Sequence, residues 1–422
     1  MQYVWQHRLL LQTDLHTVDG RKVSIIDPGR LNTGSGPDFF NAKVNIGSDM
    51  WAGDVEIHVR ASDWHRHGHD GNPAYDSVVL HVVDSDDDAV RRSNGEVIPQ
   101  MVMRCAPDFH VKYASLVDRS DIDLPCTSLL RATDSLHVND WLTAMAYERL
   151  YDKADRLTTT VEALTGDWEA ATYILLARSL GFGTNSDPME RLAKGLPLQF
   201  LRKHADSVTA IEALLFGQGG FLNTAPADDP YVALLQREYK FFAHKFGLQP
   251  MVSPGWRTGR MRPANQPHRR VAVLASLICT GKWLVDSIIR AESPEEIITF
   301  FRPEMSEYWH THYSFGSEPS RGYTTLSRAS AIVLVINVAI PLMMAYGLSH
   351  GLNELCDKAV EWLCALPPES NHIISLFADA GIKAGNAFAS QALIQVRRQY
   401  CERHACMYCR MGHRLLASHA RR

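Results

Sequence analysis

The chain has few cysteines and little net charge for its 422 residues. Its eight cysteines, most of them scattered singly, are too sparse for the disulfide framework of a small secreted domain, so we expect a reducing, cytoplasmic setting. The net charge of -4 argues against a surface that binds polyanions everywhere, and any contact with nucleic acid must therefore be local. The balance of 45% hydrophobic and 21% charged residues excludes disorder and indicates a folded chain.

Long apolar segments are almost absent as well. The N-terminal residues lack the basic stretch and apolar core of a signal peptide, so none is expected. Residues 329–346 form one largely apolar run of 18 residues, but Asn337 and Pro341 interrupt it. We therefore expect a buried core helix there and no membrane partner. Nothing in the sequence indicates an oligomeric state.

The chain divides into a strand-rich front part and a helical remainder. Short β-branched runs at 22–26, 42–46, 54–59 and 78–83 are separated by turn residues and predict strands. After about residue 139 the apolar period becomes three and four, which predicts helices near 160–181, 207–217, 229–246, 267–281, 295–303, 326–346, 351–365 and 383–400. We expect an α+β protein: a mixed sheet domain over 1–130, a larger all-helical region over 131–396 and a basic Cys/His tail over 397–422.

The densest chemistry of the front part lies around one predicted strand. Because side chains alternate along a strand, Glu56 and His58 project from the same face. If Asp38 opens the neighbouring strand of a hairpin, its carboxylate approaches that of Glu56, and two close carboxylates require a cation between them. This pattern predicts a Mg²⁺ or Mn²⁺ site able to hydrolyse phosphodiesters, with Asp38, Glu56 and His58 as its catalytic residues.

Pro37-Asp38 followed by Glu56-Ile57-His58 resembles the PD-(D/E)XK phosphodiesterase superfamily. That superfamily has Pro-Asp at a strand start, then an acidic residue, any residue and Lys; here His58 stands in place of the Lys. The resemblance implies a nuclease-like sheet and a metal-dependent nucleic-acid phosphodiesterase in which His58 orients or deprotonates the attacking water. The same replacement also fits a catalytically inactive nucleic-acid-binding or assembly protein on a nuclease-like fold.

A second resemblance extends over nearly the whole chain. Residues 31–83, 168–222 and 256–270, together with the cysteine tail, are similar to a bacterial family of unknown function. This resemblance implies a cytoplasmic bacterial protein and leaves its activity to be inferred from the residues.

A histidine-rich string follows the strand of Glu56. On a strand, His67 and His69 would face one side and bind Zn²⁺, Mn²⁺ or Fe²⁺ with Asp63, Glu56 or His81. The alternative is a solvated turn, because a glycine separates the two, and His81 in its apolar strand also fits a core histidine. With His58 these residues suggest a third function, a metal-dependent hydrolase or oxygenase of small molecules.

A basic segment in the helical part carries five arginines and no acid over residues 256–270. Arginine pairs with phosphate through two parallel hydrogen bonds, so we expect nucleic-acid contacts from these side chains: Arg257, Arg260, Arg262, Arg269 and Arg270. Alternatively, they pair with the acidic front domain and join the two halves.

The tail has a C-x₄-C-x₂-C-x₃-H spacing formed by Cys401, Cys406, Cys409 and His413. Four such ligands fit a tetrahedral Zn²⁺ that staples the chain end to the helical region, with His404 as the alternative to His413. An iron-sulfur cluster completed by an upstream cysteine, Cys364 or another single one, is the alternative that the PD-(D/E)XK resemblance implies.

Overall fold

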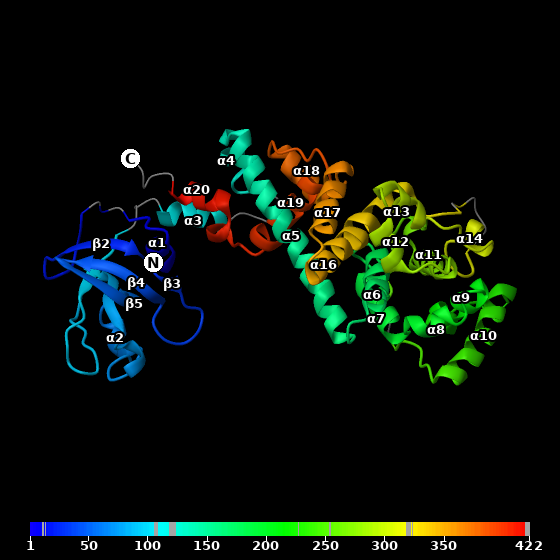
Figure 1. The fold of residues 1–422 in the computed structure, drawn as a ribbon, viewed down its shortest axis with the longest axis horizontal. Coiled ribbons are helices and arrows are strands. Elements are labelled where there is room, and N and C mark those ends of the chain that lie inside the picture. Colours follow the sequence, from blue (N-terminus) through cyan, green and yellow to red (C-terminus); the bar gives the residue numbers. More distant parts are fainter. Residues whose placement is uncertain are drawn as a thin grey trace. The chain divides into compact units, whose positions relative to one another are not determined.

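The computed structural model describes residues 1–10, 12, 14–104, 109–117, 124–226, 228–252, 255–317, 322 and 324–417. The chain forms two compact units (Figure 1). The sheet unit comprises Met1–Thr133 and Arg398–Arg422, and the helical unit comprises Asp134–Arg397. The predicted α+β class is confirmed, because a mixed sheet is followed by a mostly helical region.

The sheet unit has seven strands in the order β1-β2-β4-β5-β6-β7, with β3 paired to β4. Pairing is antiparallel from β1 to β5 and parallel from β5 to β7. The four strands predicted from β-branched runs correspond to β2, β4, β5 and β6. The bounds are β1 (Leu15–His16), β2 (Lys22–Asp27), β3 (Arg30–Leu31), β4 (Phe39–Ile46), β5 (Asp49–Arg60), β6 (Val78–Ser85) and β7 (Gln100–Val102).

Apolar side chains fill both sides of this sheet, in clusters of different size. The larger core includes Phe39 of β4, Val55 of β5 and the fully buried Trp5 of α1 (Gln2–Gln6). A smaller cluster surrounds Trp64 on α2 (Asp63–Arg66). The remaining helices of this unit are η1 (Pro73–Tyr75), α3 (Phe109–Val117), α4 (Thr127–Ala132), η6 (Cys406–Tyr408) and α20 (Arg410–Ala417).

The C-terminal tail lies in the sheet unit, which corrects our expectation that it is stapled to the helical region. The reason is hydrophobic burial: α20 places Leu416 in the larger sheet core, and Met411 is buried on the same short helix. The chain therefore leaves the sheet unit after Thr133 and returns to it at Arg398.

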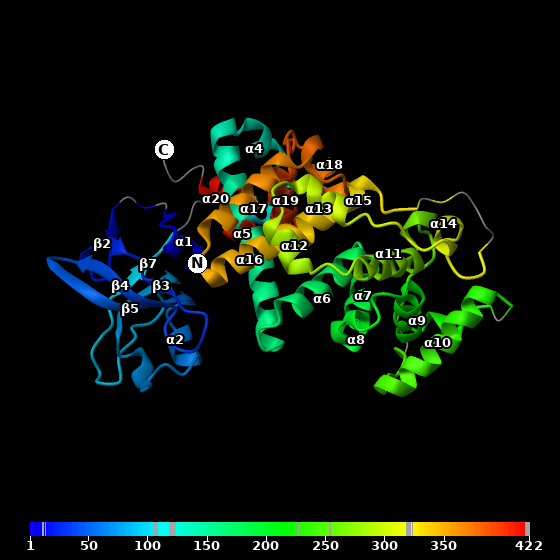
Figure 2. The same ribbon diagram turned by 45° about the vertical axis from the view of Figure 1, so that its right-hand side comes forward.

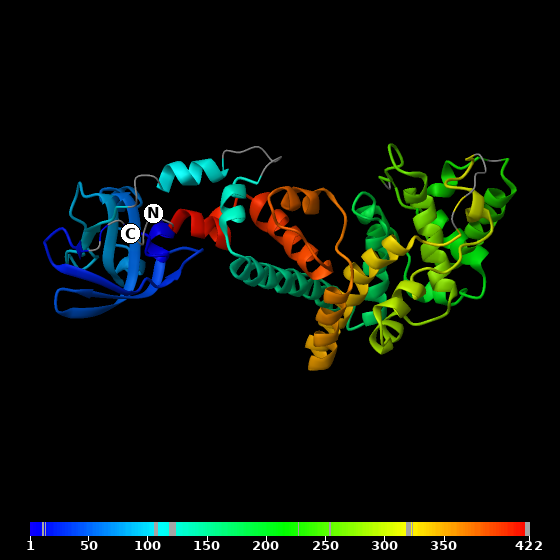
Figure 3. The same cartoon turned by 90° about the horizontal axis from the view of Figure 1, so that it is seen from above.

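The helical unit is built around one hydrophobic core. Its longest helix, α5, packs against α16 and α19, and α9 packs against α10 and α11 (Figures 2 and 3). The bounds are α5 (Ser135–Ala163), α6 (Trp168–Leu180), α7 (Ser186–Gly195), α8 (Leu198–Arg202), α9 (Val208–Gln218), η2 (Phe221–Asn223), α10 (Pro230–Phe246), η3 (Pro263–Asn265), α11 (Pro267–Cys279), α12 (Leu284–Arg290), α13 (Pro294–Phe300), α14 (Tyr308–Thr311), α15 (Arg328–Leu334), η4 (Val335–Ala339), α16 (Ile340–His350), α17 (Asn353–Ala365), α18 (His372–Asp379), α19 (Ala387–Gln395) and η5 (Val396–Cys401).

The helix predicted over 160–181 is in fact two. Thr165 and Gly166 both adopt positive φ angles, 54° and 92°, which end α5. The Asp167 side chain then accepts a hydrogen bond from the Ala170 backbone N–H and caps α6.

The apolar run of residues 329–346 lies in the continuous helix Arg328–His350. This helix has 23 residues and contains an 18-residue window with a mean hydropathy of 2.2, enough by length and composition to cross a membrane. In the described residues one helix meets that test, or two if α11 and α12, bent by 78°, count as one span. Most of the helix is buried in the core of the helical unit, as predicted, and the Lys153 Nζ contacts Asn337 Oδ1 at 2.9 Å.

Candidate metal centre in the sheet unit

Polar side chains from three neighbouring strands share one row of the sheet. Glu56 of β5 pairs with His81 of β6, which pairs with Gln100 of β7. His58 lies two residues beyond Glu56, so strand alternation places it on the same face, as the sequence predicted. All four side chains are buried, and His81 is completely so.

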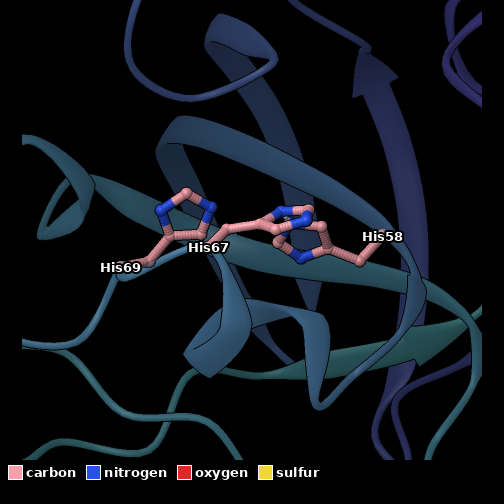
Figure 4. A group of neighbouring side chains, drawn as sticks. All are labelled: His58, His67 and His69. Carbon is pink, nitrogen blue, oxygen red and sulfur yellow. Dashed lines mark hydrogen bonds between the residues drawn. The ribbon is translucent and has the colours of Figure 1, made fainter.

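The turn after α2 brings two more histidines to this row. Gly68 has a φ of 73° and separates His67 from His69, so the backbone here is a turn and not a strand. Both rings nevertheless face His58, with ring centroids 4.9 Å and 5.3 Å away (Figure 4). The buried Trp64 ring packs edge-on against His69 and supports the turn.

The ring nitrogens of these histidines are spaced as ligands of one ion would be. The Nε2 atom of His58 lies 3.0 Å from Nδ1 of His67, and one nitrogen from each of the three histidines falls within 4.8 Å of the others. Neighbouring ligand atoms around a divalent ion bound at about 2.1 Å lie about 3.0 to 3.4 Å apart. Glu56 Oε1 lies 3.4 Å from Nε2 of both His58 and His69, beside the same position.

Hydrogen bonds behind the cluster fix which nitrogen of His58 carries the proton. Gln100 Nε2 donates to Asp86 Oδ1 (2.6 Å) and to the Asp88 carbonyl (2.8 Å), so its Oε1 must accept from Nδ1 of His81 at 3.1 Å. Nε2 of His81 then accepts from Nδ1 of His58 at 2.9 Å. The remaining nitrogen of His58, Nε2, presents a lone pair to the cluster, as a metal ligand requires.

Burial keeps these imidazoles neutral. It lowers the pKa of His58 to about 3, with further effects from His81, His67 and His69, and it lowers the pKa of His81 to about 4. The pKa of His69 is also lowered by burial, and its Nε2 atom is buried without a hydrogen-bond partner. A cation bound among these lone pairs would satisfy the buried nitrogen of His69.

Glu56 lies in an environment that disfavours its charge. Burial, and then the neighbouring Asp38, raise the pKa of Glu56 to about 8. Its Oε2 atom accepts a hydrogen bond from the Asp38 backbone N–H at 2.9 Å, which turns Oε1 toward the histidines. A divalent cation would restore the carboxylate form.

Asp38 lies beside Glu56, as expected for a residue that opens β4 opposite β5. Its carboxylate accepts hydrogen bonds from Gln2 Nε2 (2.6 Å) and from the Ile57 backbone N–H (3.2 Å). Asp38 therefore orients Glu56. The atoms that are spaced to bind an ion belong to His58, His67 and His69, so the candidate site contains more histidine than the sequence suggested. Sequence reasoning missed Gln100. Its only signal in the sequence is that a polar residue stands next to apolar residues of a short strand.

Residues 1–372 match the family described as Protein of unknown function (DUF2851). The chain belongs to this family. The whole-chain resemblance inferred from the sequence is thereby confirmed, whereas the PD-(D/E)XK likeness of the front part gains no support from these comparisons. No curated protein and no solved structure matches the chain.

In the described residues of the DUF2851 chain, the ligand atoms of the tail do not form a group of three or more within 4.8 Å of one another. His413 Nδ1 instead lies 2.7 Å from the Tyr3 hydroxyl, and its ring packs against His7. Among the described residues, the group of three or more ligands close enough to hold an ion is that of His58, His67 and His69.

The upstream cysteine beside the tail is Cys126 rather than Cys364. Burial, together with the nearby Cys409 and Cys406, raises the pKa of Cys126 to about 12. Cys364 is exposed on α17 of the helical unit. The Zn²⁺ or iron-sulfur staple stays a prediction.

The five arginines of the basic segment separate into two groups. Arg269 and Arg270 are buried in the first turn of α11, with only 3% and 5% of their surface exposed, so they are not available for surface contact with nucleic acid. Arg269 donates to the backbone carbonyl of Trp309 in the same unit. The other three are exposed and remain candidates for phosphate contacts: Arg257, Arg260 and Arg262.

Proposed function

We propose that the protein is a metal-dependent phosphodiesterase acting on nucleic acid, with the ion held by His58, His67 and His69. The observation that carries this proposal is the convergence of three histidine nitrogens beside Glu56, one of them buried without a partner. Three protein ligands that leave a coordination position open are typical of catalytic and not of structural zinc sites. The exposed arginines of the helical unit support nucleic acid as the substrate.

The ligand atoms limit which metal ion the site can bind. Sequence reasoning expected Mg²⁺ or Mn²⁺ at Asp38 and Glu56, but imidazole nitrogen is a poor ligand for Mg²⁺ and suits Zn²⁺, Mn²⁺ and Fe²⁺. We therefore propose Mn²⁺ or Zn²⁺ as the working ion.

An ion held by His58, His67 and His69 would lower the pKa of a coordinated water and stabilise charge on the phosphate. Glu56 would accept the proton of the attacking water, whose oxygen would form a bond to phosphorus while the bond to the leaving oxygen breaks and that oxygen gains a proton from solvent. Asp38 orients Glu56 through its backbone N–H, and His81 fixes the tautomer of His58.

The test is cleavage of a labelled oligonucleotide by the full chain with Mn²⁺, Zn²⁺ or Mg²⁺. We expect cleavage with the first two ions and a loss of at least about 100-fold in His69→Ala and in Glu56→Gln. His65→Ala is the matched control, because His65 is an exposed histidine of the same segment that pairs with Asp70. Equal cleavage by all variants would exclude this site.

A second function stays open because His58 stands where the PD-(D/E)XK resemblance requires Lys. It is a catalytically inactive nucleic-acid-binding or assembly protein. That protein would bind nucleic acid equally well in His69→Ala and would cleave nothing with any ion. We also propose a cytoplasmic location, which is supported by seven free thiols among the described residues.

A further inference from the structure

A cavity of about 590 Å³ lies in the helical unit where three segments meet. Its walls come from η2 and the glycine before it, from residues 249–252, and from the loop that leads from Trp256 into α11. This volume is in the range of pockets that hold small organic ligands.

Flat rings form part of the cavity wall. Phe221 and Trp256 stack with ring centroids 4.7 Å apart, and Trp256 Nε1 donates to the Gly219 carbonyl at 2.8 Å, which fixes the indole. The His268 ring lies 4.6 Å from that of Phe221. Burial lowers the pKa of His268 to about 4, so this ring is neutral, and its buried Nδ1 atom has no partner in the described structure. Such a wall suits a planar aromatic ligand.

The loop beside the cavity is held in place through its backbone. Asn185 donates to the Arg257 carbonyl (3.0 Å) and accepts from the Arg257 N–H (2.9 Å), while Gln266 Nε2 donates to the Thr258 carbonyl (3.0 Å). Thr258 lines the cavity. The side chains of Arg257, Arg260 and Arg262 are exposed and make no ion pair among the described residues. These guanidinium groups are therefore free to bind an anion.

Arg270 adds a buried positive charge behind this loop. Its guanidinium lies over the Phe182 ring at 4.3 Å and donates to Asn265 Oδ1 at 2.7 Å, with no carboxylate partner among the described residues. Burial lowers the pKa of Arg270 to about 10, so it stays charged at neutral pH. A buried cation without a counter-ion is costly, and an anion bound nearby offsets that cost.

We propose that this cavity holds one unpaired base of a single-stranded nucleic acid, with the adjoining phosphates on Arg257, Arg260 and Arg262. Aromatic stacking requires a base whose faces are free, which a duplex does not offer. This inference rests on the proposed function, since it names the form of nucleic acid that the enzyme takes.

The experiment measures binding of a fluorescent single strand of about twelve nucleotides, and of the matching duplex, to the full chain in EDTA. Chelation prevents cleavage, so the result does not depend on the metal centre. We expect the single strand to bind at least about tenfold more tightly. The triple variant Arg257→Ala/Arg260→Ala/Arg262→Ala should weaken binding and reduce the salt slope by about 2, because each single-strand phosphate contact contributes about 0.7. Arg237→Ala, an exposed arginine of α10, is the matched control.

The cavity itself is tested by filling it. Thr258→Trp leaves the stacked Phe221 and Trp256 in place and occupies the space of the base, so we expect about tenfold weaker strand binding with an unchanged melting temperature. Equal affinity for strand and duplex, or unchanged binding by both variants, would overturn the inference. Displacement of the strand by micromolar free mononucleotide would overturn it as well and assign the cavity to a soluble nucleotide. Strand binding by a protein that cleaves nothing would refute the proposed phosphodiesterase and leave the base site standing.

Discussion

The two units each bury a histidine nitrogen without a partner, and the surroundings give these histidines different chemistry. His69 of the sheet unit faces Glu56 and the nitrogens of His58 and His67, a set of lone pairs that a cation would satisfy. His268 of the helical unit is surrounded by aromatic rings. A neutral imidazole therefore indicates a metal only where other donors converge on it.

The two units also assemble their sites differently. A sheet aligns side chains from neighbouring strands in one row, so Glu56, His81 and Gln100 meet there, and the turn after α2 adds His67 and His69. The cavity of the helical unit is lined mostly by connecting segments, because the helices bury their apolar faces in the common core. The first site thus combines a strand row with one turn, whereas the second is built from connecting segments.

The strongest test of this contrast removes one histidine from each unit. His69→Ala should abolish Mn²⁺ or Zn²⁺ binding or weaken it by more than about 100-fold, since a three-nitrogen site loses one ligand. His268→Ala should leave metal affinity unchanged. Isothermal titration of the metal-free protein measures both. Equal loss in the two variants would mean that the metal is not held in the sheet unit.

A smaller effect is expected from the residue that orients the ligands. Gln100→Leu removes the acceptor for His81 and releases the tautomer of His58, so we expect about 10- to 100-fold weaker metal binding. Gln218→Leu is the counterpart in the helical unit: its side chain bonds the Gln249 carbonyl and Tyr239, and its loss should lower stability without affecting the metal. Nitrogen-15 NMR of the histidine rings would show His58 Nδ1 losing its fixed proton only in the first variant.

The next effect concerns the pH dependence of stability of the helical unit. The pKa of His268 is about 4 when folded and about 6.5 when unfolded, so the unfolded state takes up the proton first as the pH falls. The stability that neutral His268 contributes to the folded state is complete above pH 6.5 and is lost as the pH falls from 6.5 to 4. The loss amounts to about 2 kcal/mol at pH 5. Denaturant unfolding of the helical unit at pH 7 and pH 5 measures the loss, and His268→Phe should remove it. A wild-type helical unit equally stable at both pH values would contradict the prediction.

The smallest expected effect concerns a helix cap remote from both sites. Asp167→Ala removes the acceptor for the Ala170 N–H at the start of α6 and should cost the helical unit about 1 kcal/mol. Metal affinity in the sheet unit should not change. A change in metal affinity would show that the units are energetically coupled.

The sequence predicted the parts of the site that depend on local periodicity. Strand alternation placed Glu56 and His58 on one face, and the hairpin placed Asp38 beside Glu56. The β-branched runs and the change of apolar period separated the sheet from the helices. These features involve neighbours within a strand, a hairpin or a helix. There the spacing of residues along the sequence alone determines which way their side chains point.

The remaining features depend on contacts that no local pattern encodes. Gln100 reaches His81 through the parallel pairing of two strands joined by a long connection. Arg269 and Arg270 were predicted to lie on a basic surface, yet segments distant in the sequence pack over the first turn of α11 and bury them. Cys126 lies near the tail cysteines across more than half of the chain, a proximity that only tertiary packing produces.

The return of the chain to the sheet unit at Arg398 bears on how the protein is made. A ribosome releases the strands first and the helical unit next, whereas Leu416, which completes the sheet core, emerges only near the end. The helical unit is thus an insertion that is able to fold while its host still lacks part of its core. A chain interrupted before Leu416 would therefore carry a folded helical unit joined to an incomplete sheet core, and we expect the candidate metal site to form after the helical unit.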